Sequence, residues 1–151
     1  MKNLKKGFTL IELLVVIAII GILAAIVLAS LGTARSKGND AKIKEQLGSI
    51  RNAAEVYYST NNNYGAISSA TDCTTAAAGN MGNDTSSGFK PLVTAANWPG
   101  SVNATCVTNA GAAAATAYSA SHVLSDGTYW CVDSTGASKA ETAATSASVC
   151  S

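Results

Sequence analysis

The four cysteines are the residues whose number and spacing say most about chemistry. They are Cys73, Cys106, Cys131 and Cys150, all C-terminal to position 72. No two of them form a Cys-x-x-Cys pair, and the single histidine, His122, lies near none of them in sequence, so the ligand spacing of a metal site is missing. An even number of cysteines in a small polar segment favours two disulfides in an oxidising compartment, with buried free thiols as the alternative.

Four cysteines allow three pairings. The arrangement with the shortest loops joins Cys73 to Cys106 and Cys131 to Cys150, and we expect this one. The second bond would close a loop of about 20 residues and would contribute about 3 kcal/mol in the chain-entropy model.

No other group of residues predicts catalysis or cofactor binding. The sequence has no nucleophile elbow, phosphate loop or metal-ligand cluster. His122 has no evident partner as a base, and Asp126 and Asp133 are too few carboxylates to predict a calcium site. The net charge of +1 gives no support for a nucleic-acid partner. We therefore expect no enzyme, no metal site and no cofactor.

One carboxylate, Glu12, lies inside a long apolar segment that covers residues 7–31. Three lysines (Lys2, Lys5 and Lys6) precede the segment and act as a positive-inside signal. About 20 apolar residues suffice for a helix to cross a bilayer. A charged group within such a helix is costly and therefore needs a reason.

An ordinary signal peptide is one explanation of this segment. Val27-Leu28-Ala29 before Ser30 has the small-residue pattern of a cleavage site. The apolar segment is longer than the usual core of a signal peptide, however, and Glu12 interrupts it.

The residues Gly7-Phe8-Thr9-Leu10-Ile11-Glu12 resemble the processing site of type IV pilins and pseudopilins. The resemblance implies that a prepilin peptidase cuts between Gly7 and Phe8 and that Phe8 becomes N-methylated. It also implies that the apolar segment is kept and that Glu12 pairs with the terminal amine of a neighbouring subunit. Two such charges at about 4 Å attract by several kcal/mol before desolvation is subtracted.

The function implied by this resemblance is that of a major-type pilin that polymerises into a type IV pilus. Its expected partners are identical subunits, the prepilin peptidase and an inner-membrane assembly platform, and no nucleic acid is expected. The precursor would be a single-pass protein of the inner membrane, and the product an extracellular pilus. A pseudopilin of a type II secretion or DNA-uptake system is the alternative within the family. A secreted or membrane-anchored binding domain with an ordinary signal peptide is the alternative outside it.

The fold that would position these residues is α+β, with a long N-terminal helix packed on a small antiparallel sheet. We expect a leader over residues 1–7, a membrane or filament-core helix over 8–31, an amphipathic stem over 32–62 and a disulfide-stabilised β head over 63–151. In the stem, apolar residues from Ile43 to Tyr57 recur at helical spacing. The helix is expected to continue with a bend near residues 36–40 and to end near residues 61–63.

The head is expected to contain three or four strands. The alternation of residues predicts strands over 101–107, 115–124 and 128–133, with a tight turn at Ser125-Asp126-Gly127. Residues 89–93 are expected to form either a short helix or an edge strand. The aromatic residues Tyr57, Trp98, Tyr129 and Trp130 are expected to lie in the core or at its rim.

Overall fold

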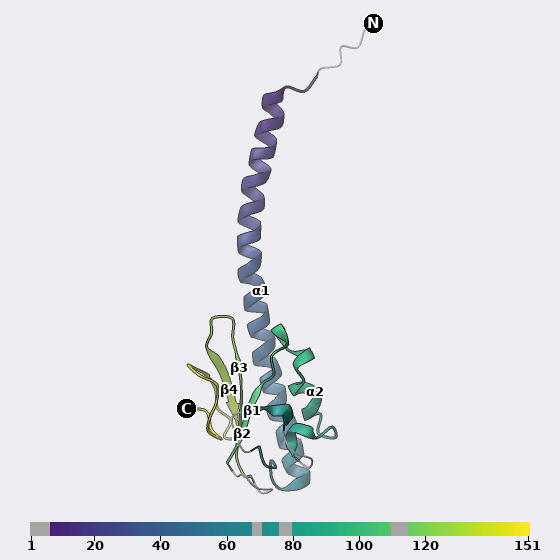
Figure 1. Ribbon diagram of the computed structural model, residues 1–151, viewed down its shortest axis with the longest axis vertical. Coiled ribbons are helices and arrows are strands. Elements are labelled where there is room, and N and C mark those ends of the chain that lie inside the picture. The colour runs from purple at the N-terminus through teal and green to yellow at the C-terminus, as the bar shows by residue number, and fades with distance from the viewer. Residues whose placement is uncertain (1–6, 68–70, 76–79, 110–114) are drawn as a thin grey trace. The chain divides into compact units, whose positions relative to one another are not determined.

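The computed structural model describes residues 7–67, 71–75, 80–109 and 115–151 (Figure 1). The predicted leader therefore lies outside the described residues, apart from Gly7. The chain forms two compact units, Met1–Lys37 and Gly38–Ser151. We call them the N-terminal unit and the C-terminal unit.

Helix α1 covers Leu10–Asn61 and contributes to both units. It continues without interruption through residues 36–40, which confirms the continuity expected from the sequence. It ends at Asn61, and Asn62 takes a left-handed conformation (φ 54°) while its N–H donates to the carbonyl of Tyr58 (2.7 Å). Asparagine tolerates this conformation better than most residues, so the predicted stop has a physical basis in Asn62.

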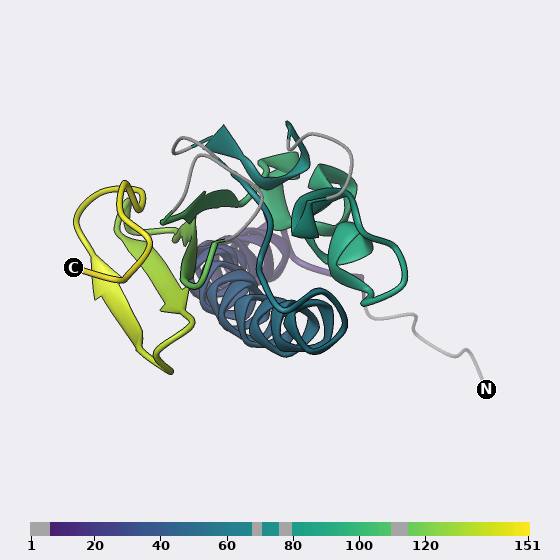
Figure 2. The same ribbon diagram turned by 90° about the horizontal axis from the view of Figure 1, so that it is seen from below.

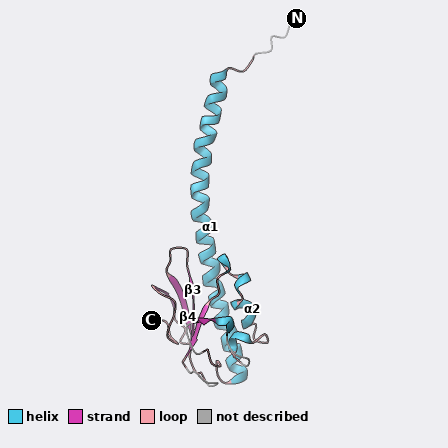
Figure 3. Ribbon diagram, in the orientation of Figure 1, coloured by secondary structure: helices cyan, strands magenta, loops and turns pink. Residues whose placement is uncertain are grey.

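A five-stranded antiparallel sheet is the centre of the C-terminal unit (Figure 3). Its strands, in spatial as well as sequence order, are β1 (Thr71–Asp72), β2 (Thr105–Thr108), β3 (Tyr118–Val123), β4 (Tyr129–Asp133) and β5 (Ser138–Glu141). The α+β fold expected from the sequence is thus confirmed. The sheet has more strands than expected, because the sequence analysis missed the short edge strands β1 and β5.

The predicted strand over 101–107 was wrong at its start. Residues 99–101 form the 3-10 turn η4 (Pro99–Ser101), and β2 begins only at Thr105. Gly100 and Ser101 both have positive φ (78° and 54°), which is incompatible with extended strand backbone. Strand β3 is likewise shorter than the predicted range of 115–124.

The two faces of the sheet are covered differently. In β3, Tyr118 and Ala120 belong to the apolar core, while Ser119 and Ser121 point to the other face, as strand alternation requires. The apolar face packs against the second half of α1, whose buried residues are Ile43, Leu47, Ile50, Ala53, Ala54 and Tyr57. In Figure 2 the C-terminal half of α1 lies beside the sheet, with α2 nearby. The predicted stem periodicity is confirmed.

Short helical elements complete the described part of the C-terminal unit. They are η1 (Cys73–Thr75), η2 (Met81–Asn83), α2 (Phe89–Val93), η3 (Ala95–Asn97) and η4 (Pro99–Ser101). Residues 89–93 are therefore a helix and not an edge strand. Phe89 and Val93 are fully buried in the core, and so is Trp98 at 3 % exposure. Trp130 packs against the core while Tyr129 is half-buried, which agrees with the expected core rim.

Two disulfides join the cysteines. Cys73 is bonded to Cys106 and Cys131 to Cys150, the two pairs expected from the sequence. The first bond joins η1 to β2, and the second joins β4 to the C-terminal segment. Together they connect segments separated by 33 and 19 positions in the sequence.

Candidate processing and assembly site

The segment Gly7–Glu12 forms a capping box at the start of α1. The N–H and hydroxyl of Thr9 both donate to Oε2 of Glu12 (2.8 Å each), and the N–H of Glu12 donates to Oγ1 of Thr9 (3.3 Å). A threonine followed three positions later by glutamate satisfies the free N–H groups of a helix start in this way. The Glu12 carboxylate also lies near the positive end of the helix dipole. Glu12 therefore has a local role in this chain in addition to any role between chains.

The helix that follows exposes its apolar side chains on all sides. Every large apolar residue from Phe8 to Leu31 is between 47 % and 82 % exposed. The helix contains a stretch that is long and apolar enough to cross a bilayer, and none of that stretch is buried against other described residues. The part of α1 in the N-terminal unit covers 28 residues (10–37), or about 42 Å at 1.5 Å per residue. Such a surface requires a lipid or protein environment.

In the C-terminal unit, two charged residues of α1 fasten the helix to the sheet. Arg51 donates from Nε to the carbonyl of Asp133 (3.3 Å). Its terminal nitrogen Nη2 donates both to the carbonyl of Ala137 and to Oγ of Ser138 (3.0 Å). Asp40 accepts from the N–H (2.8 Å) and hydroxyl (2.7 Å) of Ser125 in the β3–β4 turn. The polar side of the stem therefore makes contacts within the chain as well as with solvent.

The buried carboxylate of Asp133 organises the end of β4. Its Oδ1 accepts from the N–H (2.9 Å) and hydroxyl (2.7 Å) of Thr135 and from the N–H of Ala137 (3.0 Å). Its Oδ2 accepts from the N–H of Cys150 (2.9 Å). Burial opposes ionisation, but these hydrogen bonds, led by the one from Cys150, outweigh it and hold the pKa of Asp133 below its usual value.

The two carboxylates weighed as calcium ligands have other roles. Asp126 lies in the turn before β4, where Oδ1 accepts from the N–H (2.9 Å) and hydroxyl (2.6 Å) of Thr128. Asp133 lies at the opposite end of β4. Among the described residues, the only cluster with metal-ligand geometry is Cys131, Glu141 and Cys150, and its two sulfurs are joined in a disulfide. A disulfide sulfur is not the thiolate that a metal needs.

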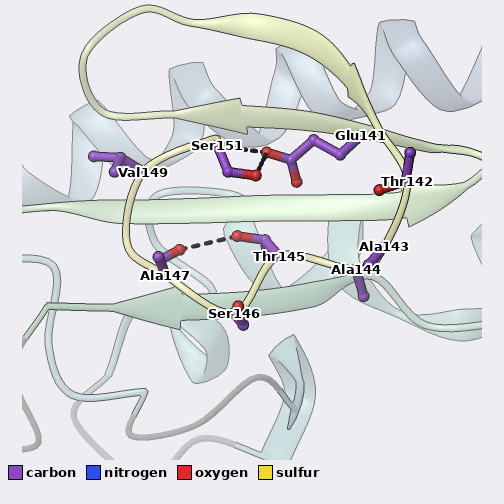
Figure 4. A pocket seen from close by; sticks show the side chains of 9 residues that line it. All are labelled: Glu141, Thr142, Ala143, Ala144, Thr145, Ser146, Ala147, Val149 and Ser151. Atoms are coloured by element: carbon purple, nitrogen blue, oxygen red, sulfur yellow. Dashed lines mark hydrogen bonds between the residues drawn. The ribbon is translucent and has the colours of Figure 1, made fainter.

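The C-terminal segment covers the polar face of the sheet through hydroxyl contacts. Oγ of Ser119 lies 2.6 Å from Oγ1 of Thr145 and also donates to the carbonyl of Ala147, while the N–H of Thr145 donates to Oγ of Ser121 (2.9 Å). This segment borders a small cavity of about 100 Å³ (Figure 4). At its edge, Oε1 of Glu141 accepts from the N–H (2.5 Å) and hydroxyl (3.1 Å) of Ser151.

Sequence reasoning missed several of these positioning residues. At the level of sequence, Asp133 is weighed only as a calcium ligand and no role is assigned to Arg51. The Asp-x-Thr spacing at both 126–128 and 133–135 is a recognisable turn signal. Nothing in the local sequence shows that Arg51 reaches a turn 82 or more positions away.

Comparisons with known proteins match part of the chain. Residues 2–28 match the family model of the prokaryotic N-terminal methylation motif. The type IV wide pilus major component PilA4 of Thermus thermophilus is 49 % identical over 59 residues, which is 39 % of this chain and 45 % of that protein. The type IV major fimbrial protein FimA of Dichelobacter nodosus is 46 % identical over 55 residues, 36 % of this chain and 35 % of that protein.

A secretion protein matches over the same share of the chain. The type II secretion system core protein G of Aeromonas hydrophila is 38 % identical over 63 residues, 42 % of this chain and 44 % of that protein. The chain thus spans less than half the length of the curated relatives that it matches, and no solved structure gives a significant match. The chain is therefore similar over part of its length to type IV pilus and fimbrial proteins and to a type II secretion core protein, and it carries a match to the N-terminal methylation motif.

Proposed function

We propose that this chain is a structural subunit of a type IV pilus. The precursor is held in the inner membrane by the apolar helix, with its lysine-rich leader in the cytoplasm. A prepilin peptidase cuts between Gly7 and Phe8, and Phe8 is N-methylated. An inner-membrane assembly platform then moves the subunits into a filament on the cell exterior, where identical chains are the main partners. The chain itself carries out no catalysis.

The observation that best supports this proposal is the exposed apolar helix that begins at a Thr9–Glu12 capping box. In a filament, the same side chains that face lipid in the precursor would pack against those of neighbouring subunits. On this basis we divide the chain into a leader (1–7), a membrane and filament-core helix (8–31), a stem (32–62) and a head (63–151).

We assign Glu12 the recognition of the new amine at Phe8 of a neighbouring subunit. Oε2 of Glu12 accepts both hydrogen bonds from Thr9, which leaves Oε1 for a second partner. Such a pair would set the axial step between helices whose remaining surface is uniformly apolar. The amine forms only on cleavage, so assembly would depend on processing.

Variants at Glu12 separate this role from capping. Glu12→Gln keeps an oxygen that can accept from Thr9 but removes the charge, whereas Glu12→Leu removes both. We expect both variants to be processed and membrane-inserted but to yield few filaments, as measured by shearing and electron microscopy. Glu45→Leu, on the stem, is the matched control. Abundant filaments from Glu12→Gln would show that the charge has no role.

The processing step has its own test. We expect N-methylated Phe8 at the start of the mature chain by N-terminal sequencing and mass spectrometry, and accumulation of the uncut precursor when Gly7 is replaced by leucine. A mature chain that starts at Ser30 would instead support the signal-peptide alternative and exclude a retained helix.

A pseudopilin is the second candidate, because a type II secretion protein is among the relatives. Deletion of the gene distinguishes the two. Loss of long surface filaments with normal secretion favours the pilus, and loss of secretion without a change in surface filaments favours the pseudopilus.

A further inference from the structure

Strand β5 is an outer edge of the sheet, and its side chains are exposed. It pairs with β4 on one side, and on its other side no described strand follows it. Figure 2 shows the strand, in yellow, at the outer side of the sheet. Ser138, Lys139 and Ala140 are exposed, and Glu141 is half-buried. An edge of this kind presents backbone N–H and C=O groups to any strand that approaches it.

The pairing of β4 with β5 determines which backbone groups of β5 face outward. The N–H of Asp133 donates to the carbonyl of Ala137 (3.3 Å), directly before β5, so the backbone of Ala137 faces β4. Backbone groups alternate in direction along an antiparallel strand, and the odd-numbered positions of β5 therefore bond to β4. The N–H and C=O groups of Ser138 and Ala140 point outward, and no backbone hydrogen bond from another described segment reaches them.

The side chains of β5 alternate between the two faces of the sheet. Ser138 lies on the face of α1, where its Oγ accepts from Arg51. Lys139 and Glu141 both lie on the opposite face, two positions apart and with opposite charges. Oε1 of Glu141 accepts from Ser151, which leaves Oε2 for a second partner.

Two copies of this edge are complementary in one antiparallel register. With Ala140 opposite Ala140 of the second copy, the outward backbone groups of both copies meet in a hydrogen-bonded pair. Lys139 then lies opposite Glu141 of the second copy, in the non-hydrogen-bonded pair where side chains are closer. A shift by two residues in either direction places Lys139 opposite Lys139, or Glu141 opposite Glu141. Opposed unlike charges stabilise a strand pair and like charges destabilise it, so the charges select one register.

We propose that β5 is a self-pairing edge that joins the C-terminal units of two copies of this chain. Ala140 lies at the two-fold axis, and an ion pair between Lys139 and Glu141 lies on each side of it. The two sheets become one continuous sheet. A two-fold contact closes at two copies and does not itself extend a filament. This inference uses no residue of the apolar helix and does not depend on the proposed pilus function.

Zero-length cross-linking tests the contact directly. Carbodiimide couples a lysine amine to a carboxylate only where the two groups touch. An equal mixture of unlabelled and ¹⁵N-labelled full chain, in detergent micelles, would be cross-linked, digested and analysed by mass spectrometry. We expect a link between Lys139 and Glu141 that joins labelled to unlabelled peptides. Links confined to single chains, or links from Lys139 only to carboxylates outside β5, would overturn the proposal.

Charge reversal tests the register. Lys139→Glu gives an edge with two acids and Glu141→Lys an edge with two bases, so neither variant should pair with itself, whereas a mixture of the two restores both unlike pairs. We expect sedimentation in micelles to show an association constant about tenfold lower for each variant alone, with recovery in the mixture. Lys90→Glu, on α2, is the matched control and should pair like the native chain. Unchanged association of Lys139→Glu would overturn the proposal.

A backbone variant tests the pairing if Glu141→Lys fails to fold. Proline at position 140 removes an N–H that points outward and leaves the bonds to β4 in place. We expect Ala140→Pro to keep the folded C-terminal unit by circular dichroism and to lose pairing, while Ala140→Ser, which retains the N–H, pairs normally. Glu12→Leu should also pair normally, which separates this contact from filament assembly. Equal association of Ala140→Pro and Ala140→Ser would contradict the proposal.

Discussion

Replacing Asp133 by asparagine tests how a single buried carboxylate holds the C-terminal unit together. Asp133 is 1 % exposed and accepts from three N–H groups and one hydroxyl. Asparagine keeps one oxygen, which can still serve Thr135 and Ala137. Its amide NH₂ would then face the N–H of Cys150, so that two donors meet.

The expected cost follows from these contacts. At least one hydrogen bond to a charged group is lost, worth about 1.5–3 kcal/mol, and a buried N–H is left unpaired at about 1–3 kcal/mol. We therefore expect Asp133→Asn to lower the free energy of unfolding by about 3 kcal/mol. This is a large fraction of the stability of a small domain.

The chain contains a matched control. Asp126 makes the same turn, with Oδ1 accepting from the N–H and hydroxyl of Thr128. It is exposed, however, and among the described residues its carboxylate accepts no hydrogen bond from a distant segment. We expect Asp126→Asn to change stability little. The difference in the free energy of unfolding between the two variants thus reports on burial and on the hydrogen bond from Cys150, because the contribution of the local turn cancels.

Urea unfolding of the full chain in micelles, followed by tyrosine and tryptophan fluorescence, gives the required free energies. The pKa of Asp133 is held low in the folded state, so its contribution is complete above about pH 4, where an unfolded aspartate is ionised. It is lost as the pH falls through the folded value, and the gap between the native chain and Asp133→Asn should narrow there. Equal losses for Asp126→Asn and Asp133→Asn at pH 7 would refute this reasoning.

The remaining predictions concern the two disulfides and Arg51. Serine replacement of Cys131 and Cys150 should cost about 3.3 kcal/mol. Serine replacement of Cys73 and Cys106 should cost about 3.8 kcal/mol, because this disulfide closes the longer loop. Denaturant unfolding measures both, and the reverse order by more than about 1 kcal/mol would contradict the chain-entropy account. Arg51→Met should cost about 2 kcal/mol, since it removes the charge-assisted hydrogen bonds to the carbonyls of Asp133 and Ala137, which keep only backbone N–H donors. Arg51→Lys should recover part of that loss, because lysine keeps a cationic donor. If Arg51→Lys and Arg51→Met lose the same stability, a single ammonium group cannot replace the guanidinium.

The fold could be predicted from sequence where the signals are strong and local. The apolar segment, the stem periodicity and the Asn stop define α1 to within two residues of the observed Leu10–Asn61. Strand β5, by contrast, is an exposed edge with no apolar alternation, so the pattern Ser-Lys-Ala-Glu carries no signal. Strand β1 has only two residues and precedes the Cys73–Cys106 disulfide, a long-range bond that no local pattern contains.

Burial of polar residues was equally hard to predict. Ser119 and Ser121 alternate with apolar residues on β3, which normally indicates a solvent-facing side. Both are fully buried here because the C-terminal segment covers them with its own hydroxyl and carbonyl groups. Thr145 of that segment is itself buried against β3, and the alanine and serine residues around it in the sequence do not predict this contact.

The effects of substitutions in the N-terminal unit and in the C-terminal unit can be distinguished by experiment. The stability of the C-terminal unit depends on the apolar face of the sheet, on the hydrogen bonds of Asp133 and Arg51, and on the disulfides. The apolar stretch of the N-terminal unit is not buried against other described residues, so a substitution there removes no packing, and Glu12→Leu removes only the local hydrogen bonds with Thr9. Variants such as Glu12→Leu should therefore leave the unfolding of the C-terminal unit unchanged, and any loss of filaments they cause must arise between molecules. Asp133→Asn should show the opposite pattern, because it destabilises the C-terminal unit while the proposed processing site at Gly7 and Phe8 remains intact.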